Sequence, residues 1–273
     1  MKNQILMAGM AFIAFIQLNA QTIKGKVVDE KSKVGIPYVN IGVIGKGIGT
    51  VSDINGDFSI FLHDSLNNGT LKLSCIGYKN ILIDVLSFKK NGIQLLKMEE
   101  NIVSLSQIIV KPKKIKTKIL GNENNSKAIV AGFRTNNLGS ELGVIMHIKK
   151  APSFIETTNF NLAYNGAGTV KFRVNIYNIK NGVVDTIILK EPIIITWAST
   201  SGPISVDLKK YNLIVENDFL VSLEWIEGYG NENINFCVGL MNRNCLFRKT
   251  SQDAWHKANP AGVGFNCKVS YEK

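Results

Sequence analysis

The three histidines of the chain, His63, His147 and His256, lie far apart in the sequence. Zinc hydrolases need clustered His and acidic ligands, as in H-E-x-x-H, and no such spacing occurs. The G-x-S-x-G turn of serine hydrolases is also missing. We therefore expect no enzyme activity, no catalytic residues, no metal and no cofactor. The alternative is a hydrolase whose site is assembled in the C-terminal part of the chain.

The segment from Asp53 to Asp57 has the alternating Asp and Asn residues that begin a calcium-binding loop. The bidentate Glu expected at the twelfth position is replaced by Asp64. Short Asp and Asn side chains also close tight turns by bonding to their own backbone, and Gly56 permits a positive φ. We interpret this segment as a turn.

Aromatic side chains offer a different chemistry. Trp197, Trp225, Tyr229 and Trp255 all lie in the C-terminal half, and Asp253 stands close to Trp255. Sugar-binding β-sandwiches stack an aromatic ring on the C–H face of a sugar, while polar neighbours bond to its hydroxyls. On this interpretation Tyr229, Asp253 and Trp255 bind a ligand. The alternative interpretation is structural: Trp197 and Trp225 belong to the core, and Trp255 caps the sandwich.

The chain is basic, with 32 Lys and Arg against 21 Asp and Glu and a net charge of +11. A basic surface favours acidic partners such as lipid headgroups, nucleic acids or acidic glycans. The lysines are mostly single and alternate with apolar residues, unlike the grooves of single-strand binders. We therefore expect no nucleic-acid partner. The simpler interpretation of the charge is that it keeps an exported protein soluble.

Residues 1–20 have the layout of a secretory signal peptide, with Lys2 before an apolar run and Ala20 at its end. We expect cleavage between Ala20 and Gln21. A membrane anchor is the alternative, but the run is shorter than the ~20 residues that span a bilayer. No later segment approaches that length, so we expect no transmembrane segment in the mature chain, with peripheral membrane contact as an option.

Four cysteines in an exported chain raise the question of disulfides. Cys75 is alone in the N-terminal half, whereas Cys237, Cys245 and Cys267 lie in the C-terminal half. Cys237 and Cys245 flank a predicted hairpin turn and could form a bridge. We expect the commoner outcome for so few cysteines, which is buried thiols in a sheet core.

Period-two alternation of apolar and polar residues, as in 58–62 and 170–177, predicts short β-strands throughout. We expect an all-β protein with a small sandwich at 21–111 and a larger, jelly-roll-like sandwich at 128–273. Residues 112–127 are basic and polar, which predicts a linker. The apolar run 193–195 predicts a strand covered on both faces.

Four segments of the first sandwich occur in order and at close spacing: Gly25–Asp29, Gly35–Ile41, Gly49–Phe58 and Leu73–Tyr78. Together they resemble the carboxypeptidase regulatory-like domain over about residues 22–111. The resemblance implies a transthyretin-like β-sandwich that serves as an accessory unit in exported proteins of Gram-negative bacteria. The second domain is left without a family.

These observations together predict a non-catalytic accessory or binding protein of the cell envelope. We expect the first domain to be structural and to face a partner, and the second to bind a ligand, with a glycan or an envelope protein as the partner. The location implied is the periplasm, the outer membrane or the cell surface. An envelope hydrolase is the alternative function.

Overall fold

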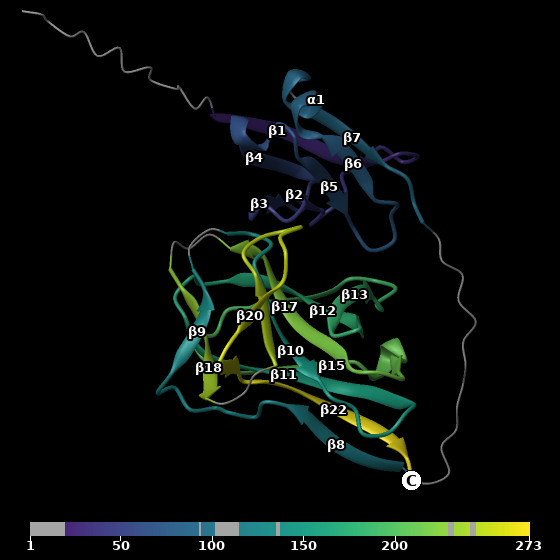
Figure 1. Ribbon diagram of the computed structural model, residues 1–273, viewed down its shortest axis with the longest axis vertical. Coiled ribbons are helices and arrows are strands. Elements are labelled where there is room, and N and C mark those ends of the chain that lie inside the picture. The colour runs from purple at the N-terminus through teal and green to yellow at the C-terminus, as the bar shows by residue number, and fades with distance from the viewer. Residues whose placement is uncertain (1–19, 93, 102–114, 135–136, 229–231, 241–243) are drawn as a thin grey trace, which may run out of the picture.

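The computed structural model describes residues 20–92, 94–101, 115–134, 137–228, 232–240 and 244–273 (Figure 1). Strands make up 58% of the described residues and helices 5%, so the prediction of an all-β sandwich protein is confirmed. The predicted signal peptide lies outside the described residues except for Ala20, which belongs to the first strand. Within the described part of the chain, no helix is long and apolar enough to cross a membrane.

Two sheets form the N-terminal sandwich, which we define as residues 20–98. The three-stranded sheet has the order β4-β1-β7, with β1 at Ala20–Asp29, β4 at Asp57–His63 and β7 at Gln94–Met98. The four-stranded sheet has the order β3-β2-β5-β6, with β2 at Asn40–Val43, β3 at Ile48–Val51, β5 at Thr70–Ser74 and β6 at Ile81–Asp84. Their inward side chains form one apolar core.

Alternation places the core residues as the sequence predicts. Along β4, Phe58, Ile60 and Leu62 are buried while the residues between them face solvent. The turn before β4 is also confirmed, because one carboxylate oxygen of Asp53 accepts the backbone N–H groups of Asn55 and Asp57 at 2.8 and 2.9 Å. That oxygen is therefore engaged in closing the turn.

A short helix, α1 at Val85–Lys90, was not expected. Asp84 caps it by accepting the N–H of Ser87 at 2.9 Å, and Val85 and Phe88 anchor it in the core. Six residues are fewer than two turns, so the sequence shows no helical period to detect. Two 3₁₀ turns complete the helical content: η1 at Asp64–Leu66 and η2 at Lys209–Tyr211.

The C-terminal sandwich, defined as residues 115–272, packs a seven-stranded sheet against an eight-stranded sheet around a second apolar core. The seven-stranded sheet contains β10 (Glu141–Met146), β12 (Val170–Lys180), β13 (Val183–Ile187), β14 (Ile193–Trp197), β17 (Phe219–Gly228), β19 (Cys245–Arg248) and β20 (His256–Ala258). The eight-stranded sheet contains β8 (Ile115–Gly121), β9 (Val130–Phe133), β11 (Ser153–Asn165), β15 (Gly202–Asp207), β16 (Ile214–Val215), β18 (Ile234–Leu240), β21 (Ala261–Val263) and β22 (Phe265–Glu272).

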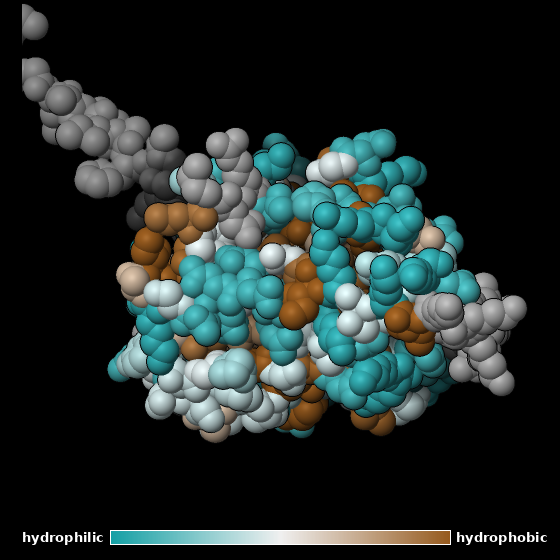
Figure 2. Space-filling view, turned by 90° about the horizontal axis from the view of Figure 1, so that it is seen from below, coloured by the Kyte–Doolittle hydropathy of each residue, from teal (hydrophilic) through white to brown (hydrophobic). Residues whose placement is uncertain are grey.

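The predicted linker at 112–127 is wrong over part of its length, because 115–121 form β8, which pairs with β22 at the end of the eight-stranded sheet. Of the lysines that suggested a linker, Lys116 is exposed and Lys118 is half-buried on this edge strand. Lysines on an edge strand discourage pairing with another chain. On the end of the C-terminal sandwich seen in Figure 2, hydrophobic areas are separate and lie among hydrophilic ones.

One further expectation, the burial of residues 193–195 on both faces, differs from the structure. Strand β14 is an edge strand paired only with β12, and Ile194 is 37% exposed, so the strand is not covered on both faces. All four cysteines are free. Cys237 and Cys245 do not form the alternative bridge, and their strands β18 and β19 belong to different sheets rather than to one hairpin. The expected buried thiols are found at Cys237, Cys245 and Cys267.

Candidate ligand-binding cleft

The seven-stranded sheet has one apolar face and one polar face. Along β12, Phe172, Val174 and Ile176 enter the C-terminal core, so Arg173 and Asn175 point the opposite way. That opposite face meets the four-stranded sheet of the N-terminal sandwich (Figure 1). The side chains on this face are nevertheless buried, because the two sandwiches cover them.

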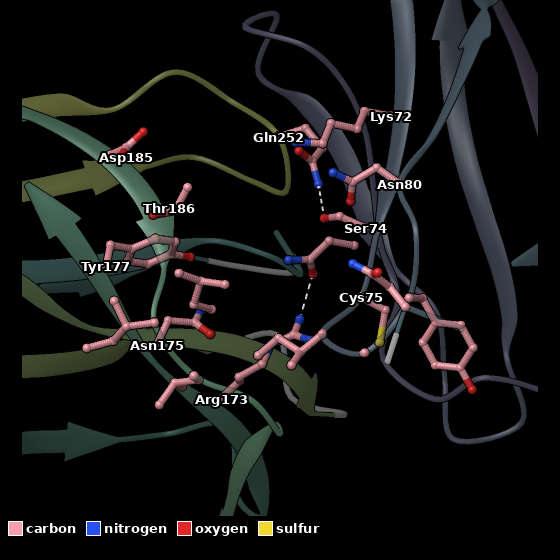
Figure 3. Close-up of a pocket in the computed structure, with 18 of the residues that line it drawn as sticks. Lys72, Ser74, Cys75, Asn80, Arg173, Asn175, Tyr177, Asp185, Thr186 and Gln252 are labelled. Atoms are coloured by element: carbon pink, nitrogen blue, oxygen red, sulfur yellow. Dashed lines mark hydrogen bonds between the residues drawn. The ribbon is translucent and has the colours of Figure 1, made fainter. Parts of the chain in front are cut away.

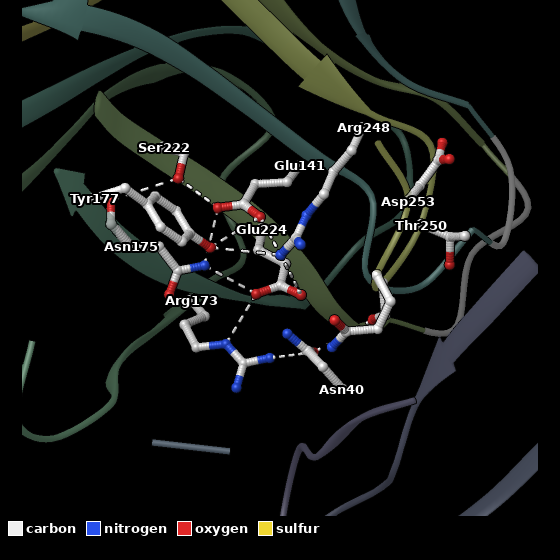
Figure 4. A network of polar contacts seen from close by, with 12 residues as sticks. Asn40, Glu141, Arg173, Asn175, Tyr177, Ser222, Glu224, Arg248, Thr250 and Asp253 are labelled. Atoms are coloured by element: carbon white, nitrogen blue, oxygen red, sulfur yellow. Dashed lines mark hydrogen bonds and ion pairs between the residues drawn. The ribbon is translucent and has the colours of Figure 1, made fainter. Parts of the chain in front are cut away.

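Two glutamates and two arginines form the centre of this polar face (Figure 4). Arg173 Nε lies 2.9 Å from Glu224 Oε2, and Arg248 lies 2.5 Å from Glu141 Oε2. Both glutamate side chains are fully buried. Asn175 links the pairs by donating to Glu141 and Glu224, each at 2.9 Å. Two positive and two negative charges therefore balance inside the protein, as buried charges require.

The surroundings fix the charge states in this cluster. Burial alone would lower the pKa of Arg173, but the attraction of Glu224 outweighs it and raises the pKa. Arg248 behaves in the same way, with Glu141 as the main attracting charge. Burial raises the pKa of Tyr177 well above its usual value, and the charge of Glu141 adds to the effect. Both guanidinium groups therefore stay charged and the phenol stays neutral.

Arg173 also connects the two sandwiches. It donates to the backbone oxygen of Tyr38 at 2.9 Å and to Asn40 Oδ1 at 2.6 Å. The Tyr38 backbone has a φ of +56°, a costly conformation for this residue type. Its hydroxyl donates to Glu227 and accepts from Lys171, both at 2.7 Å. One tyrosine thus carries polar contacts to three residues of the C-terminal sandwich.

A second set of contacts joins the 249–255 segment to the N-terminal sandwich. Gln252 Nε2 donates to Ser74 Oγ at 2.7 Å, and the N–H of Gly45 donates to the backbone oxygen of Gln252 at 2.9 Å. Val51 and Ile226 pack together as part of a small apolar cluster at the same junction. The sandwiches are therefore held by both polar and apolar contacts.

Beside these contacts the junction leaves a cleft of about 680 Å³ (Figure 3). Its N-terminal wall comes from β2, β5 and the segment that follows β5. Its C-terminal wall comes from β12, β13, the segment after β13, β19 and the segment after β19. A volume of this size is typical of sites for small ligands. Among the residues that line the cleft are Lys72, Ser74, Cys75, Asn80, Asn101, Tyr177, Asp185, Lys190, Arg248 and Trp255.

An aromatic pair lines the C-terminal wall. The rings of Tyr177 and Trp255 meet edge to face, with centroids 5.8 Å apart. The guanidinium of Arg248 lies over the Trp255 ring, 5.2 Å from its centroid. Edge-to-face packing and a cation over a ring both stabilise a ring position. Trp255 is therefore held in place although it remains partly exposed.

The cleft has little that would support hydrolysis. The carboxylates of Glu141 and Glu224 do not line it, and both are engaged by arginines. Loss of hydration raises the pKa of the Cys75 thiol, which disfavours the nucleophilic thiolate. The hydroxyl of Ser74 accepts a hydrogen bond from Gln252. No histidine is among the described residues around the cleft.

Of the three residues predicted to bind a ligand, the structure places only one in the lining of the cleft. Trp255 lines the cleft. Asp253 is 9% exposed and lies outside the lining, where its carboxylate accepts the N–H groups of Ala254 and Lys249 at 2.9 and 3.3 Å. Its visible role is to shape the segment that carries Trp255. Tyr229 lies outside the described residues.

The other two tryptophans fit the structural interpretation. Trp225 is fully buried in the C-terminal core, and its indole N–H donates to the Glu227 backbone oxygen at 3.0 Å. Trp197 is partly buried against the same core.

Sequence reasoning missed Lys72, Tyr177 and Arg248 as residues that line a common cleft. The available signal was the alternation on β12, where Arg173 and Asn175 stand between apolar residues. That pattern predicts a polar face, but it does not show that a second sandwich covers the face.

Comparison with known proteins finds a family match for the first sandwich and distant likenesses to solved structures. Residues 23–110 match the model of the CarboxypepD_reg-like domain. No curated protein matches the sequence. A structure of the cysteine protease and lectin-like domains of Cwp84, a surface layer associated protein of Clostridium difficile, matches with 10% identity and a TM-score of 0.43. The match covers 56% of this chain and 36% of that one.

A second Cwp84 structure matches with 9% identity and a TM-score of 0.44 over 57% of this chain. This chain spans 40% of its length. A structure of infectious bursal disease virus matches over 92% of this chain and 62% of that chain, with 10% identity and a TM-score of 0.26. These values are too low to support an argument about activity. The family match covers β2 to β7 and most of β1, which confirms the resemblance of the first sandwich to the carboxypeptidase regulatory-like domain.

Proposed function

We propose that the protein is a non-catalytic binding protein of the cell envelope that holds a sugar-based ligand in the cleft between its two sandwiches. The carboxypeptidase regulatory-like domain supports an accessory role in an exported protein. The two sandwiches act as two domains that share one binding site. The first domain then has a second task besides facing a partner, because it supplies one wall of the cleft.

The aromatic wall beside amide side chains is the observation that carries this proposal. Tyr177 and Trp255 offer ring surface for the C–H face of a sugar. Asn80 and Asn101 line the same cleft and can bond to hydroxyl groups through their amides. Apolar rings with a few polar groups around them are typical of sites that orient a small ligand.

Replacement of Trp255 by Ala is expected to weaken glycan binding about tenfold, which corresponds to ~1.4 kcal/mol. The change removes both ring stacking and contact area at the cleft. The measurement is a binding screen of the chain from residue 21 onward against neutral and acidic glycans and cell-wall polymers. Isothermal titration then gives the affinity of each probe that binds.

Phe61→Ala provides a matched control, since Phe61 is an aromatic residue of β4 that is 48% exposed and does not line the cleft. Trp255→Phe keeps a ring and should retain most of the affinity. Equal binding by the native chain and Trp255→Ala would contradict the proposed site. A screen in which no glycan binds would contradict the proposed function.

A further inference from the structure

We infer, on the basis of the proposed function, that the ligand is an acidic glycan whose anionic group binds between Lys72 of the first domain and Arg248 of the second. The two residues belong to different sandwiches and line the same cleft. The anion would therefore connect the two domains as well as fix the position of the sugar.

Among the described residues, Lys72 is a cation that has no counter-ion. It lies on β5 between Leu71 and Leu73, which enter the N-terminal core, so its side chain takes the opposite face together with Ser74. Among the residues that the structure describes, Lys72 has no hydrogen-bond or ion-pair partner. The attraction between an ammonium group and an anion is stronger at a partly closed junction than in open water.

Arg248 lies on the opposite wall. Its side chain is only 10% exposed, and its Nε is buried without a hydrogen-bond partner among the described residues. Its ion pair with Glu141 holds one end of the guanidinium, while the ring of Trp255 packs against the plane. The Arg248 side chain is therefore held rigid before a ligand arrives, which lowers the entropy cost of binding.

The charge balance of the cleft favours an anion. Four cations line it, Lys72, Arg173, Lys190 and Arg248, and Asp185 is the one acidic residue among the described lining residues. Each arginine is paired with a glutamate that does not line the cleft, and the two lysines face a single carboxylate. Burial lowers the pKa of Lys72, and the charge of Arg248 lowers it further. The two cations therefore repel each other across the cleft, and an anion between them would relieve that repulsion.

Two cations alone could also bind inorganic phosphate, but the rest of the lining indicates a larger ligand. The cleft of about 680 Å³ contains the Tyr177–Trp255 pair and the amides of Asn80 and Asn101. These groups match the ring face and hydroxyls of a sugar. The shared chemistry is a sugar that carries a carboxylate, a sulfate or a phosphate.

The test uses matched pairs of probes and the chain from residue 21 onward. Galacturonan oligosaccharides are compared with their methyl esters, sulfated heparin oligosaccharides with desulfated ones, and mannose 6-phosphate with mannose. In at least one pair the acidic form should bind about tenfold more tightly than its neutral form. This preference should weaken as the salt concentration rises, because salt screens charges.

Lys72→Met should remove the preference for the acidic probe and leave affinity for the neutral probe unchanged. Lys26→Met is the matched control, because Lys26 pairs with Asp57 on the surface and does not line the cleft. Thermal unfolding of both variants confirms that each is folded. If Lys72→Met keeps the full preference, the inferred anion site is wrong.

The outcomes separate this inference from the proposed function. Equal affinity for the acidic and neutral member of every pair that binds would overturn the acidic ligand and leave the glycan-binding function standing. No binding of any probe would overturn both. Tighter binding of a single-stranded oligonucleotide than of every glycan would replace the sugar by a nucleic acid and would also overturn the inference.

Discussion

Replacement of Arg173 by Ala is expected to lower the free energy of unfolding by about 3–5 kcal/mol, the usual cost of removing one member of a buried ion pair. The loss would leave the fully buried carboxylate of Glu224 without its nearest cation. It would also remove the donors to the Tyr38 backbone oxygen and to Asn40. One substitution thus affects both the charge balance of the C-terminal sandwich and its junction with the N-terminal sandwich.

Urea denaturation at neutral pH measures this cost, and Lys26→Ala is the control. Lys26 pairs with Asp57 at 3.0 Å, but both side chains are exposed, so breaking the pair should change the stability by less than about 1 kcal/mol. Arg173→Lys should recover only part of the loss. A single ammonium group cannot match the planar array of donors that reaches Glu224, Tyr38 and Asn40 together.

A double mutant separates the buried charge from the lost packing. If the uncompensated carboxylate of Glu224 causes most of the loss, adding Glu224→Gln to Arg173→Met should cost less than the sum of the two single changes. The expected coupling is about 1 kcal/mol or more. Strict additivity, or a loss below about 1 kcal/mol for Arg173→Ala, would show that the cluster contributes little to stability.

Local patterns in the sequence were sufficient to predict strand β4 and the turn before it. Phe58 and Ile60 are buried where the alternation places them, and Asp53 closes the turn that its side chain predicts. Both features depend on interactions within a few residues. The family resemblance over the first sandwich is confirmed for a related reason, since its motifs combine such turns with core positions.

The cleft could not be predicted in the same way, because it depends on how two sandwiches meet. Lys72 and Arg248 are more than a hundred residues apart in the chain, and neither strand carries information about the other. The alternation on β12 separated Arg173 from the core, yet it could not distinguish a solvent-exposed polar face from a covered one. Trp255 could be predicted as a ligand-binding residue because an aromatic residue among polar sequence neighbours is a local signal.

Edge strands mark another limit of prediction from the sequence. The lysines of β8 resemble those of a solvated linker, and the apolar residues of β14 resemble those of a central strand. Each position in a sheet is set by neighbours that are distant in the sequence. The short helix α1 was missed because six residues contain no full hydrophobic period.

The closest approach of the two sandwiches gives the other large expected effect. Gly42 lies in β2 on the face that meets the C-terminal sandwich, and a Cβ added there would stand 2.2 Å from the backbone oxygen of Ser251. Gly49, its neighbour across the β2–β3 pair, would place a Cβ 2.5 Å from the same oxygen. Backbone atoms cannot move aside as the end of a flexible side chain can, so any side chain at position 42 must displace one sandwich.

Gly42→Ala is therefore expected to destabilise the protein by about 1–3 kcal/mol, the range for overpacking at a close contact. It should also separate the sandwiches locally, which weakens the bond between Gln252 and Ser74 and opens the cleft. Small-angle X-ray scattering should show a larger radius of gyration. Thermal unfolding should change from one transition to two, because the domains no longer stabilise each other.

Gly182→Ala separates this steric effect from backbone strain. Gly182 has a φ of +74° but no atom within 4 Å of the added Cβ, so the variant should cost about 1–2 kcal/mol and leave the junction intact. Ligand binding discriminates further, because Gly42→Ala should lose affinity for any probe that contacts both Lys72 and Arg248. Gly42→Ala could instead keep the native radius of gyration and the full affinity for the probe. The cleft would then not require the close contact between Gly42 and Ser251, and each sandwich would hold its wall of the cleft independently of the other.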